Sequence, residues 1–166
     1  MAFDFTEFVN TKLKRYQQNF VLAPTQLRKF STKAVLNWQK VKFTQANRGS
    51  IPKNRGIYAF VVERNGFQLP PHGYVMYVGI TGKTPTSVRT LRARYGEYLQ
   101  EKRVNKRAGV HYMLNNWAAS LFFHYAVVPD KRFNLSTLEK TVSDAMIPPY
   151  STNDFSAEIR KAKKAF

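Results

Sequence analysis

Two β-prone runs decide the fold of this chain: GIYAFVV at residues 56–62 and YVMYVGI at residues 74–80. Both runs are rich in β-branched and aromatic residues, which is typical of strands. The loop between them, residues 63–73, contains Asn65-Gly66 and Pro70-Pro71 and is too long for a tight turn. The sequence therefore predicts two strands that pair like a hairpin across a long loop.

Helical patterns surround these two strands. Apolar residues at helical spacing predict a short helix within 3–20, a second helix from Thr25 that extends to Lys40, and a third over 87–102. The chain then continues with a helix over 110–119, a strand over 121–128, a helix over 135–147 and a basic helix from Ser156. This order predicts an α+β fold within the broad α/β class: a small, mostly antiparallel three-stranded sheet flanked by helices.

Charge and patterning divide the chain into three parts. We expect a basic helical N-terminal extension at 1–53, a central domain at 54–155 and a basic C-terminal helix at 156–166. Cysteine is absent, which excludes disulfides, thiol catalysis and zinc–thiolate sites. The opening MAFDFTEFVN has early acidic residues and lacks the apolar centre of a signal peptide, so we expect a soluble, cytoplasmic protein.

The charge balance predicts a nucleic-acid partner. The chain has 27 Lys and Arg against 10 Asp and Glu, a net charge of +17. Neutralising phosphates releases counterions and drives binding, whereas no long apolar run or lipidation signal favours a membrane. The residues that we expect to contact a phosphate backbone lie near and along the predicted helix 87–102 and in the basic loop after it: Lys83, Arg89, Arg92, Lys102, Arg103, Lys106 and Arg107.

Each central strand carries a tyrosine in its motif. Alternation places Tyr58 with Phe60 and Val62, and places Tyr77 with Val75 and Gly79. Gly79 leaves space beside Tyr77 where a backbone or a ligand can come close. The alternative interpretation is that both tyrosines are half-buried strand aromatics without a chemical role.

Three polar residues on the predicted helices complete a candidate site. Arg94 and Tyr98 are four residues apart and share one helix face, beside the apolar stripe. Glu139 lies near the start of the helix 135–147, where a capping box with Ser136 is the competing structural interpretation. If Glu139 binds a metal, a single carboxylate completed by water and phosphate oxygens would suit Mg²⁺ or Mn²⁺.

In this order, the residues of 54–155 resemble the GIY-YIG nuclease superfamily. Gly56-Ile57-Tyr58 matches the first family motif, and Tyr77-Val78-Gly79 matches the second with valine in place of isoleucine. Arg94 with Tyr98 resembles the arginine helix of the family, and Leu138-Glu139 matches its metal-binding glutamate. The run Pro148-Pro149-Tyr150-Ser151-Thr152-Asn153 resembles the Pro-x-Asn close of the family domain. The loop between the two motifs is longer than in most members, and Ile80 stands where some members have a lysine.

The resemblance implies a Mg²⁺-dependent endonuclease that hydrolyses phosphodiester bonds in double-stranded or branched DNA. Glu139 would hold the metal, and Arg94 would stabilise charge on the scissile phosphate. Tyr58 would accept the proton of the attacking water, which requires neighbouring cations to lower its pKa. Tyr77 and Tyr98 would orient water or phosphate, and Asn153 would support the site by hydrogen bonding.

Two questions stay open on the sequence. The chain could instead be a basic nucleic-acid-binding module that keeps this fold without cleaving. With one site per chain, a monomer would nick one strand, so double-strand cutting would require a homodimer or two successive events.

Overall fold

The computed structural model describes residues 4–63, 72–84, 86–152 and 154–165. Within these ranges the elements follow in the order α1 Phe5–Glu7, α2 Pro24–Lys29, β1 Gln39–Lys42, β2 Gly56–Glu63, β3 Gly73–Thr81, α3 Leu91–Val104, α4 Ala108–Asn116, β4 Leu121–Val127, α5 Leu135–Met146 and α6 Ala157–Lys163. Helical segments at Phe8–Leu13 and Lys14–Tyr16 continue α1, and short helical turns lie at Ala46–Ser50 and Ala118–Ser120.

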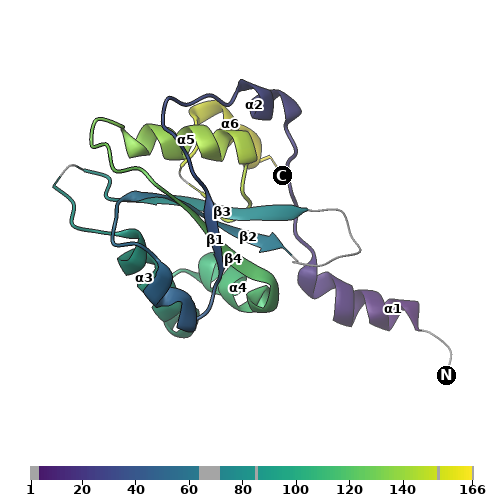
Figure 1. Ribbon diagram of the computed structural model, residues 1–166. Helices are drawn as coiled ribbons and strands as arrows, with labels where there is room; N and C mark the ends of the chain where they lie inside the picture. The colour runs from purple at the N-terminus through teal and green to yellow at the C-terminus, as the bar shows by residue number, and fades with distance from the viewer. Residues whose placement is uncertain (1–3, 64–71, 85, 153, 166) are drawn as a thin grey trace.

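The four strands form one antiparallel sheet in the order β1-β4-β2-β3. Helices α3 and α4 lie on one face of this sheet, and α2, α5 and α6 lie on the other (Figure 1). The helical arm that begins with α1 projects from the rest of the molecule. The predicted α+β class is therefore confirmed. In the part of the chain that the structure describes, no helix is long and apolar enough to cross a bilayer.

Strand β2 separates two apolar clusters, because its alternate side chains point to opposite faces of the sheet. Tyr58 and Phe60 pack on the side of α3 and α4. Ile57, Ala59 and Val61 pack on the side of α5. The predicted alternation of this strand is confirmed, and it places Tyr58 on the face of the sheet that α3 covers.

The prediction of three strands is wrong, because the segment 39–42 adds a fourth. The expected helix from Thr25 ends at Lys29, and Phe30 takes an extended conformation. The chain then runs to β1, which pairs with β4 at the edge of the sheet. Only Val41 of β1 is partly buried, so the polar sequence QKVK gave little strand signal. Lysines on both sides of Val41 suit an edge strand, because they oppose pairing with another chain.

Helix α3, which carries Arg94, begins later than the sequence predicted. Its N-cap is Thr90, whose side-chain oxygen accepts the backbone N–H of Ala93 at 3.2 Å. Val88, which was expected in the apolar stripe, precedes the helix and is 93% exposed. The helix extends to Val104 and ends at Asn105, which has a left-handed backbone with φ 51°. This later end shortens the predicted basic loop and brings Arg107 close to the helix.

The pairing of β2 with β3 explains the two glycines of the central motifs. Gly79 lies directly opposite Tyr58, and a methyl group at Gly79 would collide with the Tyr58 phenol. The space at Gly79 is thus filled by Tyr58. Gly56 is equally confined, because a methyl group there would collide with the carbonyl oxygen of Ala126 on β4.

A bulge in β3 corrects the predicted face of Val75. The register shifts between Phe60 and Val61, so that Phe60 pairs with Tyr77 and Val61 pairs with Val75. As a result Val75 packs against the α5 cluster while Tyr77 packs against the α3 cluster. The prediction that Tyr77 and Val75 share a face is therefore wrong.

Replacing Gly79 with alanine tests the close approach to Tyr58. We expect Gly79→Ala to lower the free energy of unfolding by about 1–3 kcal/mol, because the buried phenol must move. Gly49→Ala is the matched control, since a methyl group at Gly49 meets no atom within 4 Å, and we expect it to change stability by less than about 1 kcal/mol. Urea denaturation of both variants measures the difference, and equal stability of the two would contradict the packing.

Candidate active site

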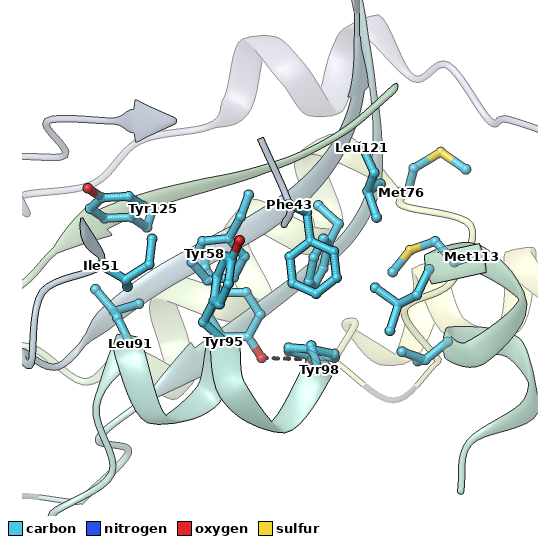
Figure 2. Close-up of a cluster of buried hydrophobic side chains, with 14 residues drawn as sticks. Phe43, Ile51, Tyr58, Met76, Leu91, Tyr95, Tyr98, Met113, Leu121 and Tyr125 are labelled. Carbon is cyan, nitrogen blue, oxygen red and sulfur yellow. Dashed lines mark hydrogen bonds between the residues drawn. The ribbon is translucent and has the colours of Figure 1, made fainter. Parts of the chain in front are cut away.

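Tyr58 and Tyr98 meet inside the core between the sheet and α3 (Figure 2). Their hydroxyl oxygens are 2.9 Å apart in a hydrogen bond, and neither side chain is exposed to solvent. A buried phenol needs hydrogen-bond partners, because an unmet polar group in the core costs free energy. The two tyrosines thus satisfy one another in part, and a third group completes the set.

That third group is the guanidinium of Arg94. Its Nε donates to the hydroxyl of Tyr58 at 2.9 Å, and its Nη2 donates to the hydroxyl of Tyr98 at 3.3 Å. Its Nη1 donates to Oε2 of Glu97 at 2.6 Å. The Arg94 side chain is 16% exposed, so the cation lies at the boundary between core and solvent. A phosphate bound there would face a cation in a setting of low dielectric, where the attraction is strong.

Tyr77 lies at the outer end of this tyrosine group. It is partly exposed, hydrogen-bonds with Tyr98, and its ring centroid is 6.0 Å from that of Tyr98. Tyr58 is farther from solvent than Tyr77. The rings of the two residues are stacked, with their centroids 6.4 Å apart. Of the predicted site tyrosines, Tyr77 is therefore the one that a water molecule or a phosphate reaches most directly.

Burial outweighs the cation that was expected to lower the pKa of Tyr58. Burial raises the pKa of Tyr58 well above its ordinary value, and the charge and hydrogen bond of Arg94 offset only part of this rise. Burial raises the pKa of Tyr77 and of Tyr98 in the same way. Taking a phenolate out of water costs more than one guanidinium returns, so all three phenols are neutral at pH 7.

Glu139 approaches from the other face of the sheet. It lies on α5, and its carboxylate accepts the backbone N–H of Ile80 near the end of the edge strand β3. Burial and then the negative charge of Asp154 raise the pKa of Glu139 to about 7, while the cations of Lys83 and Arg94 oppose the rise. Glu139 is thus within electrostatic reach of the arginine that binds the tyrosines.

The capping-box interpretation of Glu139 is wrong. The N-cap of α5 is Asn134, whose side-chain oxygen accepts the backbone N–H groups of Ser136 and Thr137 at 3.0 and 3.2 Å. Glu139 lies beyond the position from which a glutamate folds back onto the cap. The carboxylate of Glu139 therefore does not cap α5. It lies instead at the edge of β3, near the backbone of Ile80.

Glu139 and Asp154 fit the donor chemistry of Mg²⁺ or Mn²⁺. Hard divalent cations prefer oxygen ligands and retain several waters, and a cation beside two carboxylates relieves the repulsion that raises the pKa of Glu139. Across the described ranges, no three His, Cys, Asp or Glu side chains cluster as a ready-made metal site, so water and phosphate oxygens would supply the remaining ligands. Sequence reasoning missed Asp154, although its place beside Asn153 was an available signal. Asn153 itself lies outside the described residues.

The basic residues predicted to contact nucleic acid have different surroundings. Arg92 is used within the protein, since its Nε and Nη2 donate to the carbonyls of Ile51 and Gly49 at 2.6 and 2.7 Å. Arg89 pairs with Glu97, the glutamate that also binds Arg94. Lys83, Arg89, Arg103 and Lys106 are exposed, whereas Arg92, Lys102 and Arg107 are partly buried.

Comparison of this chain with protein-family models, with curated proteins and with solved structures gave no match. The resemblance in the motifs therefore stays a prediction. The geometric feature that bears on function is the pair of hydrogen bonds from Arg94 to Tyr58 and Tyr98, and beside it stands the raised pKa of Glu139 near Asp154.

Removing the charge of Glu139 should stabilise the metal-free protein. A carboxyl whose folded pKa is raised favours its protonated form, so the cost of ionising it begins above pH 4.5 and is complete above pH 7. We expect Glu139→Gln to raise the free energy of unfolding by about 1–2 kcal/mol at pH 8, after allowing for partial exposure, and to have no effect at pH 4. Denaturation in a chelating buffer at both pH values measures this difference.

Glu158→Gln is the control for the loss of a negative charge, because Glu158 is exposed on α6. If both substitutions change stability equally at pH 8, then the buried environment assigned to Glu139 is incorrect.

Proposed function

We propose that this chain is a metal-dependent DNA endonuclease of the GIY-YIG type, with one phosphodiester-hydrolysing site. The observation that supports it most is the hydrogen bonding of Arg94 to the hydroxyls of both Tyr58 and Tyr98. Glu139, whose pKa is raised by burial and by Asp154, also feels the charge of Arg94, which opposes that rise. A buried phenol needs a hydrogen-bond partner but not a charged one, so a partly buried guanidinium bound to two phenols, together with a carboxylate of raised pKa, favours a functional role.

Hydrolysis forms a bond from a water oxygen to phosphorus and breaks a bond from phosphorus to one ester oxygen. Negative charge builds on the other phosphate oxygens, and Arg94 would bind them through charge-assisted hydrogen bonds. The departing ester oxygen takes up a proton from solvent. A divalent cation held by Glu139 and Asp154 would supply Lewis-acid charge at the phosphate.

The structure changes which tyrosine we assign to the attacking water. Tyr77 is partly exposed and neutral, so it would orient the water by hydrogen bonding while the proton of the water passes to solvent. Tyr58 is fully buried and accepts the Nε–H of Arg94, so we assign to it the positioning of the guanidinium. Tyr98 would couple the two, since it hydrogen-bonds with both of the other phenols.

Nucleic acid is the partner that the charge favours, and the family resemblance specifies double-stranded or branched DNA as the substrate. The net charge of +17 and the exposed cations Lys83, Arg103 and Lys106 supply the phosphate contacts. One observation supports the alternative of a binding module that does not cleave: Tyr58 and Tyr98 are completely buried, as expected for aromatic residues with a purely structural role.

Substitution of Glu139 tests the enzyme against the binding module. With Mg²⁺, the protein should nick supercoiled plasmid or cut branched DNA, and Glu139→Ala should lower the rate by about 100-fold or more, because the metal loses a ligand. Glu158→Ala, on the exposed face of α6, should leave the rate unchanged. Tight DNA binding without any cleavage by wild type would establish the binding module, and equal cleavage by Glu139→Ala would mean that the site is misplaced.

Substitution of Arg94 separates catalysis from general phosphate binding. We expect Arg94→Lys to lower the single-turnover cleavage rate by about 100-fold or more while changing DNA affinity by less than about 10-fold, because a lysine cannot bind both tyrosines and a phosphate. Quenched-flow cleavage at saturating DNA and a filter-binding titration measure the two quantities. Losses of equal size would make Arg94 an ordinary phosphate contact.

A further inference from the structure

Arg107 lies in the tyrosine group, although it belongs to the turn between α3 and α4. Asn105 ends α3 in a left-handed conformation, and the chain reverses so that Arg107 becomes the residue before α4. Its guanidinium carbon lies 5.0 Å from the centre of the Tyr98 ring. The guanidinium carbon of Arg94 lies 4.8 Å from the centre of the same ring. Two cations from different segments therefore converge on one phenol.

A buried glutamate fixes the position of Arg107. Glu101 is only 6% exposed, and its Oε1 accepts the backbone N–H of Arg107 at 2.5 Å. Its Oε2 lies 3.6 Å from Nε of the same arginine. A carboxylate that is buried needs a cation and hydrogen bonds to offset its lost hydration. Glu101 thus holds both the backbone and the side chain of Arg107.

The charged side chains around Tyr98 have a net positive charge that favours binding of an anion. Arg89 and Arg94 share Glu97, and Arg107 pairs with Glu101. Three arginines against two glutamates leave one positive charge in excess beside the phenols. The Arg107 side chain is 38% exposed, so a phosphate in solvent can reach it. Two guanidinium groups that approach one ring repel each other, and a phosphate between them removes that repulsion.

We propose that Arg107 is a second phosphate-binding arginine of the active site, and that Glu101 is its positioning residue. This inference rests on the proposed nuclease function. Arg94 would bind the scissile phosphate from the α3 side, and Arg107 would bind it from the start of α4. The two arginines together match the charge that builds on the phosphate oxygens during attack.

The cleavage experiment compares Arg107→Ala with Lys131→Ala, which removes an exposed charge between β4 and α5. At saturating DNA with Mg²⁺, Arg107→Ala should lower the single-turnover rate by about 10- to 100-fold, and Lys131→Ala should leave it unchanged within about 2-fold. Arg107→Ala should weaken DNA binding by less than about 10-fold. Methylguanidine added to solution should restore part of the rate of Arg107→Ala. Equal rates for the two variants would overturn the proposal.

Loss of Arg107 leaves Glu101 unpaired, so folding must be separated from catalysis. The double variant Arg107→Ala/Glu101→Gln removes that unpaired charge and should recover stability in thermal unfolding. Its cleavage rate should stay as low as that of Arg107→Ala. Recovery of cleavage together with stability would show a structural role alone and would overturn the proposal. Glu101→Gln by itself should lower the rate without response to methylguanidine, because its arginine is present but displaced.

Titration with inorganic phosphate in the absence of metal separates this proposal from the nuclease function. In wild type, phosphate should shift the Nε–H signals of both Arg94 and Arg107 in a ¹⁵N-resolved spectrum. If both signals shift while wild type cleaves no DNA, the nuclease function fails and the two-arginine phosphate site stands. If wild type cleaves DNA while only the Arg94 signal shifts, the function stands and the role of Arg107 is overturned.

Discussion

The hydrogen bond from Arg94 to the buried hydroxyl of Tyr58 is the interaction on which the rest of the site depends. It joins α3 to the centre of the sheet, and it requires a phenol that is held rigidly. The rings of Phe60, Tyr98 and Phe123 hold that phenol in place, and Gly79 on the neighbouring strand leaves the space for it. This one contact thus links the helix, the strand pair and the cation.

Placing a guanidinium against a core of aromatic rings has an electrostatic cost, and the chain offsets it with its few acidic residues. It has 10 Asp and Glu against 27 Lys and Arg. Two of those carboxylates, Glu97 and Glu101, lie on α3 and pair with the arginines around Tyr98. Their placement keeps several arginines together and leaves a small positive excess, which is the condition for binding a phosphate without repelling the chain itself.

Glu97 and Glu101 pair with arginines, whereas the surroundings of Glu139 disfavour its negative charge. Its carboxylate is partly buried near Asp154, and its raised pKa means that the ionised form is held at a cost to stability. Residues kept under such a cost are concentrated at functional sites, because a ligand repays it on binding. The edge of β3 is suited to this arrangement, since β3 is the last strand of the described sheet and Ile80 there offers Glu139 a backbone N–H.

The sequence by itself determined the two central strands, the faces of Tyr58 and Phe60, the strand 121–128, and the existence of the helices that carry Arg94 and Glu139, because these depend on local periodicity. It also brought Tyr58, Tyr77, Arg94 and Tyr98 forward as one group. Tertiary structure decided what periodicity does not encode: the polar edge strand β1, the bulge that turns Val75 away from Tyr77, and the sign of the Tyr58 pKa shift, which burial sets. It also brought Asp154 and Arg107 to the site, since their positions follow from chain reversals rather than from spacing along one helix or strand.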